Sequence, residues 1–124
     1  MMAEMRIAIL HYTMPPVVGG VERVLGEQAR ALSALGHEVS LWAGTAARDF
    51  RARLEAGAFD AVLVHNVFTM PFDLEWTREL TGLAAAHQAV CWVNWVHDVA
   101  AVNPAYQHLG WKEPVPEALH VAVS

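Results

Sequence analysis

The sequence is poor in several features, and each absence narrows what the protein can do. It contains one cysteine, Cys91, in an apolar segment, so we expect a buried, reduced thiol in a cytoplasmic protein. No apolar run approaches the roughly 18 residues of a membrane-spanning helix, and the start of the chain lacks a signal-peptide profile. Charged residues make up only 17% of the chain, its net charge is −5 and no basic cluster is present, so we expect no nucleic-acid partner.

The motifs of several common enzyme classes are also missing. A dinucleotide-binding loop needs G-x-G-x-x-G and a carboxylate after the second strand. Here the glycines are adjacent, and the second predicted strand runs into Gly44-Thr45 with no carboxylate. The chain also lacks the Gly-Lys-Ser/Thr of a P-loop, metal-ligand spacings such as H-E-x-x-H or C-x-x-C, and a G-x-S-x-G elbow. We therefore expect no nicotinamide, ATP or zinc enzyme, no serine hydrolase, and no metal or other cofactor.

Apolar periodicity predicts strands and helices that alternate within one domain. The chain has 124 residues, 55% of them hydrophobic, which is enough for one sizeable core. The predicted strands are 6–11, 39–43, 61–65, 89–95 and 119–123, and the predicted helices are 21–35, 46–56 and a third that runs from Asp73, as N-cap, to about 86. Short joins require parallel strands. Right-handed crossovers then favour a Rossmann-like, doubly wound α/β/α sheet of about five strands in the order 3-2-1-4-5.

The most informative stretch is Pro15 to Arg23, which places Gly19-Gly20 between the first strand and the first helix. Glycine lets a ligand approach the main chain, and the first N–H groups of a helix lack internal partners, so this order of elements makes an anion site. The same glycines also suit an ordinary strand-to-helix turn. If the loop binds a ligand, the absence of the dinucleotide motif favours a phosphate or a sugar.

His97 and Asp98 follow the fourth predicted strand. In the predicted order the winding reverses between the first and fourth strands, and ligands of such sheets bind at that reversal. His97 can therefore donate to a sugar hydroxyl or a phosphate, or act as an acid or base. Asp98 can orient it, receive a hydroxyl or cap a turn. A His-Asp pair in a loop is also common as a structural feature.

Other polar residues lie at the ends of the remaining strands. His11 and His65 end the first and third strands, but two strands about 4.8 Å apart would separate His65 from His97, so we expect no shared zinc. Asn66 and Thr69 suit either a polyol contact or a turn. We interpret the strand tryptophans as core residues: Trp42, Trp92 and Trp95. The arginines of the second helix form either a solvated face or a peripheral contact with an anionic membrane surface: Arg48, Arg51 and Arg53.

Several of these segments together resemble the opening of retaining GT-B glycosyltransferases of the glycogen-synthase-like group. The resemblance rests first on Met5 to Leu10, Gly19-Gly20-Val21-Glu22 and Gly36-His37-Glu38-Val39. Looser matches are His65-Asn66, Trp95 to Asp98 and Val121 to Ser124. The resemblance covers nearly the whole chain. It implies the N-terminal, acceptor-side domain of a two-domain enzyme whose other Rossmann-like domain holds the nucleotide-sugar donor.

The resemblance also implies roles for particular residues. Gly19 and Gly20 would approach the donor diphosphate or the transferred sugar, and His97 would be the catalytic residue beside that sugar and the acceptor. The residues that bind the acceptor would be Asn66, Glu22 and Asp98. We expect residues 1–124 to be a single domain of a longer enzyme that transfers sugar to a saccharide, lipid or small-molecule acceptor. On their own they should be inactive, since the groups that stabilise the leaving diphosphate belong to the other domain.

Two other functions remain open on the sequence. The chain can be a free-standing flavodoxin-like module that binds a phosphorylated ligand without catalysis, or a Rossmann-like scaffold that acts through protein contacts. Because the fifth strand ends the chain, we also expect an uncovered sheet face and self-association of the isolated chain. The apolar residues expected to be partly exposed there are Val90, Trp92, Leu119, Val121 and Val123.

Overall fold

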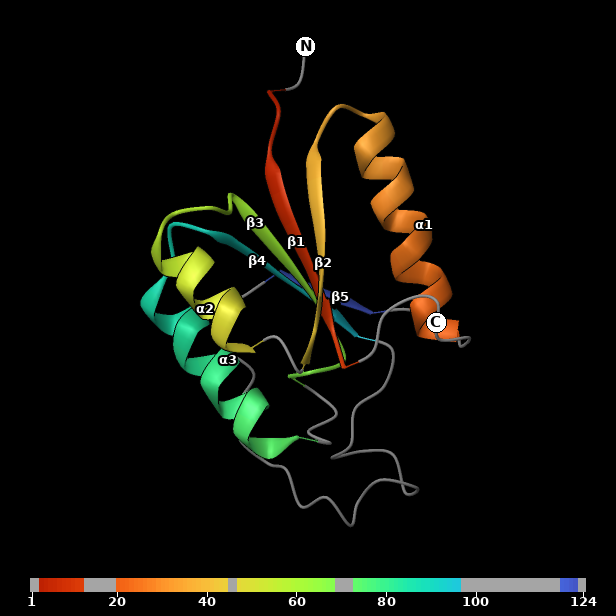
Figure 1. The fold of residues 1–124 in the computed structure, drawn as a ribbon. Coiled ribbons are helices and arrows are strands. Elements are labelled where there is room, and N and C mark those ends of the chain that lie inside the picture. The colour runs from red at the N-terminus through yellow and green to blue at the C-terminus, as the bar shows by residue number, and fades with distance from the viewer. Residues whose placement is uncertain (1–2, 13–19, 45–46, 69–72, 97–118, 123–124) are drawn as a thin grey trace.

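Strands and helices alternate along the chain as the apolar periodicity predicts (Figure 1). The computed structural model describes residues 3–12, 20–44, 47–68, 73–96 and 119–122. Their elements are, in order, β1 (Arg6–His11), α1 (Gly20–Ala34), β2 (Glu38–Ala43), α2 (Ala47–Glu55), β3 (Ala61–His65), α3 (Leu74–Ala86), β4 (Cys91–Val96) and β5 (Leu119–Ala122). Every predicted element is confirmed, and Asp73 caps α3 by accepting a hydrogen bond from the Trp76 amide at 3.1 Å.

The sheet is parallel and Rossmann-like, but its strand order differs from the prediction. The order is β2-β1-β3-β4-β5, and β3 pairs with β1 on one side and with β4 on the other. The predicted order 3-2-1-4-5 is therefore wrong. After β2 the chain crosses back over β1 before it adds β3, and a right-handed crossover permits either direction. The winding consequently reverses between β1 and β3, as it does in flavodoxin-like sheets.

The two faces of the sheet carry separate cores. α2 and α3 lie on one face and α1 lies on the other (Figure 1). The larger core, under α2 and α3, includes Ala8, Leu10, Phe50, Leu54, Val62, Val64, Trp76, Leu80 and Trp92. The smaller core, under α1, is built on Ile7, Ile9, Leu25 and Ala61, with Val21, Ala29 and Leu32 packed against it. The α1 residues in this core are spaced three or four positions apart, which is the amphipathic stripe that predicted the helix.

Phe50 of α2 lies at the centre of an aromatic group in the larger core. Its ring stacks on Phe59 with centroids 5.4 Å apart and meets the edges of Trp42 and Trp76 at 5.8 and 6.2 Å. Phe50 is fully buried and Trp92 is 3% exposed. The interpretation of Trp42 and Trp92 as core residues is confirmed. The expectation that Trp92 is partly exposed is wrong, because its ring lies on the face that α3 covers.

The prediction that Cys91 is buried is wrong, because the residue is exposed. Cys91 pairs with Ala61 in the sheet and therefore shares the face of the α1 core. Val93 and Trp95 follow on this face and are half-buried, as is Val121 of β5. Among the described helices, α1 is the one on this face, and it packs over β1, β2 and β3. The thiol lies at the start of β4, beyond the cover of α1.

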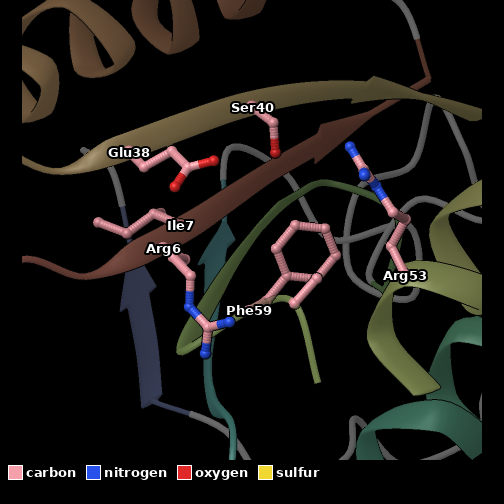
Figure 2. Close-up of a pocket in the computed structure, with 7 residues that line it drawn as sticks. Arg6, Ile7, Glu38, Ser40, Arg53 and Phe59 are labelled. Carbon is pink, nitrogen blue, oxygen red and sulfur yellow. The ribbon is translucent and has the colours of Figure 1, made fainter. Parts of the chain in front are cut away.

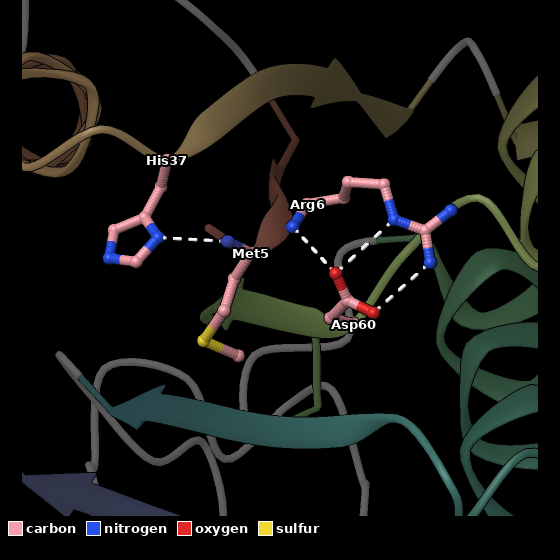
Figure 3. Close-up of polar contacts among 4 residues, drawn as sticks. All are labelled: Met5, Arg6, His37 and Asp60. Atoms are coloured by element: carbon pink, nitrogen blue, oxygen red, sulfur yellow. Dashed lines mark hydrogen bonds and ion pairs between the residues drawn. The ribbon is translucent and has the colours of Figure 1, made fainter. Parts of the chain in front are cut away.

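Two polar contacts join the amino ends of the strands (Figure 3). The Nδ1 atom of His37 accepts a hydrogen bond from the Met5 amide at 3.0 Å. The Asp60 carboxylate accepts bonds from the Arg6 amide and from both ends of the Arg6 guanidinium, at 2.8 to 3.2 Å. Gly36, with φ at 96°, ends α1 as predicted. The Gly36-His37 part of the motif therefore fixes the turn from α1 to β2.

The arginines of α2 lie on a solvated surface. Arg51 contacts Glu55 at 2.9 Å and Glu79 at 3.6 Å, and the Arg53 guanidinium lies 5.9 Å from the centre of the Trp42 ring. Arg48 is exposed. The predicted solvated face is therefore confirmed, and the alternative of peripheral contact with an anionic membrane surface stays a prediction. None of the helices within the described ranges has the length and apolar character needed to cross a bilayer.

Candidate functional site

The reversal of winding brings the carboxyl ends of β1 and β3 together. β1 ends at His11 and β3 ends at His65, and both residues are buried, at 7% and 0% exposure. The preceding residues of the two strands, Leu10 and Val64, are direct partners in the sheet. Ligands of doubly wound sheets bind outside the carboxyl ends of the strands at this point. The corrected strand order therefore places the candidate site beside β1 and β3 rather than beside β1 and β4.

Helix α1 contacts both histidines, through Glu22 in its first turn and Gln28 in its third. Oε1 of Glu22 lies 3.9 Å from Nδ1 of His11, and the Glu22 side chain is 12% exposed. Nε2 of His65 is hydrogen-bonded to Oε1 of Gln28 at 2.7 Å. Since α1 is anchored in this way, its amino terminus, with its N–H groups that lack partners inside the helix, stays at the carboxyl edge of the sheet.

Gly20 is the first residue of α1 and is exposed. A Cβ atom built on Gly20 would have no heavy atom within 4 Å, apart from its neighbours in the chain and helix. No crowding within the described part of the chain explains a glycine here. The open approach to its main chain is what close contact with a phosphate or a sugar requires.

Asn66 follows β3 in a left-handed conformation, with φ at 65°. Its backbone N–H donates a hydrogen bond to the Trp95 carbonyl at 3.4 Å, and the residue is buried. Asparagine is one of the few residues enriched at positive φ, which accounts for it as a turn residue. The side-chain amide of Asn66 also lies at the carboxyl edge of the sheet, where an acceptor would bind. The Asn66 position thus fits both predicted roles.

The structure brings three of the predicted site residues, Gly20, Glu22 and Asn66, to one edge of the sheet. Gly19, His97 and Asp98, together with Thr69 and most of the Pro15–Arg23 loop, lie outside the described residues. The argument that two strands separate His65 from His97 is wrong, because β3 pairs directly with β4 and His65 is opposite Trp95. In the part of the chain that is described, no three His, Cys, Asp or Glu side chains come together as a metal site.

The family model for Glycosyltransferase Family 4 matches residues 18–117. The chain belongs to glycosyltransferase family 4. Comparison with curated proteins and with solved structures found no match. The matched segment contains all of the predicted site residues: Gly19, Gly20, Glu22, Asn66, His97 and Asp98. Membership of this family confirms the predicted resemblance and implies a nucleotide-sugar and an acceptor as substrates.

Sequence reasoning missed how the family 4 domain holds its strand-end histidines. One signal was present in α1, where Gln28 interrupts a stripe of apolar residues that includes Leu25 and Leu32. A polar side chain in such a stripe needs a buried partner, and the partner is His65. The contact joins residues 37 positions apart, so local pattern alone could not have identified it.

A small pocket lies at the amino ends of the strands, at the edge of the sheet opposite the candidate site (Figure 2). It has a volume of about 90 Å³ and is lined by Arg6, Ile7, Glu38, Ser40, Arg53, Ala58 and Phe59. Arg6 and Glu38 begin β1 and β2, so this pocket lies at the amino ends of the strands. The Arg6 guanidinium is already held by Asp60. This pocket is therefore separate from the candidate site.

Proposed function

We propose that this family 4 domain holds the acceptor while a sugar is transferred to it from a nucleotide-sugar donor. The observation that carries the proposal is the meeting of Gly20, Glu22 and Asn66 at the β1–β3 reversal, in a chain that belongs to a glycosyltransferase family. In the GT-B glycosyltransferases that this chain resembles, the donor-binding domain faces the carboxyl edge of this sheet across a cleft. The proposal also treats residues 1–124 as one domain of a longer, cytoplasmic enzyme.

Each predicted residue has a chemical task in this proposal. The main chain at Gly19 and Gly20, with the amino terminus of α1, approaches the donor diphosphate, because unpaired N–H groups and the helix dipole attract anions. His97 donates a hydrogen bond to the transferred sugar beside the acceptor. Glu22 and Asn66 exchange hydrogen bonds with hydroxyl groups of the acceptor, and Asp98, which follows β4 in the sequence, accepts a hydrogen bond from a further acceptor hydroxyl.

A binding module without catalysis is the second candidate, because the order β2-β1-β3-β4-β5 is also that of flavodoxin-like sheets. The two candidates differ in what happens to a nucleotide sugar. In the intact protein that carries this domain, His97→Ala should reduce sugar transfer by at least about tenfold, the effect of losing about 1.4 kcal/mol of transition-state stabilisation. The matched control is His87→Ala, since His87 caps the carboxyl end of α3.

The acceptor-side role is tested by measuring the KM for the acceptor and the KM for the donor separately. Glu22→Gln should raise the acceptor KM by about tenfold while the donor KM changes little. Glu27→Gln is the control on the same helix, because Glu27 is exposed and pairs with Arg23 at 3.4 Å. A rise in the donor KM alone would assign Glu22 to the donor and overturn the acceptor-side role. Full activity in His97→Ala would refute the catalytic role of His97, and binding of a nucleotide sugar by the parent protein without any transfer would favour the binding module.

A further inference from the structure

A small open pocket lies between the carboxyl end of β2 and the amino end of α3. Its volume is about 110 Å³, and it is lined by Gly44, Asp73, Glu75, Trp76 and Glu79. Gly44 follows Ala43, which is paired with His11 at the end of β1. The pocket is therefore on the carboxyl edge of the sheet, the same edge as the candidate site, but next to β2 rather than between β1 and β3.

The indole of Trp76 places an unsatisfied donor at this pocket. Trp76 is 2% exposed, and its Nε1 atom has no hydrogen-bond partner among the described residues. By contrast, the Nε1 atoms of Trp42 and Trp92 donate to the Ser40 hydroxyl at 2.8 Å and to the His87 carbonyl at 3.0 Å. A buried polar group without a partner is rare in native proteins and calls for an explanation, such as a bound group.

Gly44 lies close to the edge of this indole. A Cβ atom on Gly44 would lie 3.3 Å from Cδ1 and 3.4 Å from Nε1 of Trp76. The indole edge that carries the N–H therefore faces Gly44, which forms the opposite wall of the pocket. Gly44 is absent from the residues with positive φ in the described part of the chain. The glycine is thus explained by the space in front of the indole edge rather than by its backbone angles.

The remaining lining groups are acidic and restrict the chemistry of the ligand. Glu75 and Glu79 lie one helical turn apart on α3, where like charges repel, and only Glu79 contacts a cation among the described residues, Arg51 at 3.6 Å. An anionic ligand would be repelled by these carboxylates. A metal ion or an ammonium group satisfies carboxylates but cannot accept a hydrogen bond from an indole. A hydroxyl group does both, because it donates through its hydrogen and accepts through its oxygen.

We propose that this pocket binds neighbouring hydroxyl groups of a saccharide. One hydroxyl oxygen accepts the Trp76 N–H, and the hydroxyl hydrogens are donated to the carboxylates of Glu75 and Glu79. The volume exceeds that needed for one water molecule and admits one edge of a sugar ring. The inference rests on the proposed function and deepens it, since it selects a saccharide among the possible acceptors.

The indole N–H resonances give a direct test in the ¹⁵N-labelled protein. Neutral methyl glycosides of glucose, galactose, mannose and N-acetylglucosamine are titrated to high millimolar concentration, and ethanolamine serves as the cationic probe. We expect at least one glycoside to shift the Trp76 resonance, assigned by its loss in Trp76→Phe. The Trp42 and Trp92 resonances should stay in place, because their N–H groups are already bonded.

Two substitutions and one control sharpen the test. Glu79→Gln should weaken the glycoside response by about tenfold, the loss of one charge-assisted hydrogen bond. Glu55→Gln should leave the response unchanged, although Glu55 also contacts Arg51. Gly44→Ala should abolish the response, because its methyl group would occupy the space in front of the indole edge. Folding of each variant is checked by the unchanged Trp92 resonance.

The outcomes separate this inference from the proposed function. A Trp76 resonance that responds to ethanolamine but to none of the glycosides would overturn the hydroxyl assignment. A resonance that responds to none of the probes would mean that water alone occupies the pocket. Either result, with transfer activity intact in the whole enzyme, refutes the inference and leaves the proposed function standing. A glycoside response in a protein without transferase activity supports the saccharide pocket and refutes the proposed function.

Discussion

Replacing Asn66 by glycine and by alanine separates the backbone requirement of this position from the role of its amide group. Both variants lose the same buried side-chain amide, so the difference between them reports on the backbone. With φ at 65°, the position is left-handed, and an alanine held there costs about 1–2 kcal/mol. At ordinary positions alanine is the more stable of the two by about 0.4–1 kcal/mol, because glycine has more freedom in the unfolded chain.

We therefore expect the usual order to be inverted at residue 66. Asn66→Gly should exceed Asn66→Ala in free energy of unfolding by about 1 kcal/mol, or by about 4 °C in Tm for a domain of this size. Urea unfolding followed by tryptophan fluorescence measures this, with the slope m unchanged between the two variants. Ala85→Gly is the control, because Ala85 lies in α3 and should show the ordinary order. Equal stability of the two variants at residue 66, or a more stable alanine variant, would refute the backbone argument.

The same pair tests the acceptor role in the intact enzyme. Asn66→Gly keeps the turn and removes the amide, so an acceptor contact predicts a raised acceptor KM in a protein that is still folded. An unchanged KM in the glycine variant would make Asn66 a turn residue alone. Because stability and binding are read from separate experiments, neither result depends on the other.

Three further predictions concern stability. Phe50→Ala should lower the free energy of unfolding by about 3–5 kcal/mol, because a fully buried ring leaves a cavity, and a loss below about 1 kcal/mol in urea titration would contradict this packing. Gly82→Ala should raise it by about 0.5–1 kcal/mol, since Gly82 is exposed within α3 and a Cβ atom there meets nothing within 4 Å; a thermal melt that is no higher than the parent's counts against it. The Arg6 guanidinium lowers the pKa of Asp60 below its usual value, so the stability from this pair is present above the unfolded pKa and is lost as the pH falls through the lower folded value. Asp60→Asn should therefore narrow the difference between urea midpoints at about pH 7 and about pH 3, and an unchanged difference would show that the pair contributes little.

The existence and type of each element could be predicted from the sequence, because each buries one apolar face. The predicted order of the strands was wrong, although a signal for the observed order was present. Residues 61–64 of β3 form a continuous apolar run, which is typical of an interior parallel strand, whereas β2 alternates with Glu38 and Ser40 as an edge strand does. Reading burial from strand composition would have placed β3 inside the sheet and β2 at its edge.

The candidate site was predictable as far as main-chain topology determines it. Gly20 and Asn66 were identified because a residue that follows a parallel strand or begins the next helix must lie at the carboxyl edge of the sheet. The pocket at Gly44 and Trp76 was not predicted, since the two residues come from different elements and meet only through the packing of α3 against the sheet. The prediction that Cys91 is buried failed for a related reason. Apolar periodicity shows that a strand has a buried face, but it does not show how far a helix extends over that face.

The position of β1 between β2 and β3 also determines the order in which the chain can assemble. β1 is synthesised first, yet both of its neighbours come later. The contact from Met5 to the start of β2 spans 32 residues, and the contact from Arg6 to the start of β3 spans 54. Loop-closure entropy favours the shorter connection by only about 0.5 kcal/mol. Until residue 65 leaves the ribosome, the apolar segment Ile7 to Leu10 lacks at least one neighbouring strand, and during that interval the nascent chain is most exposed to aggregation.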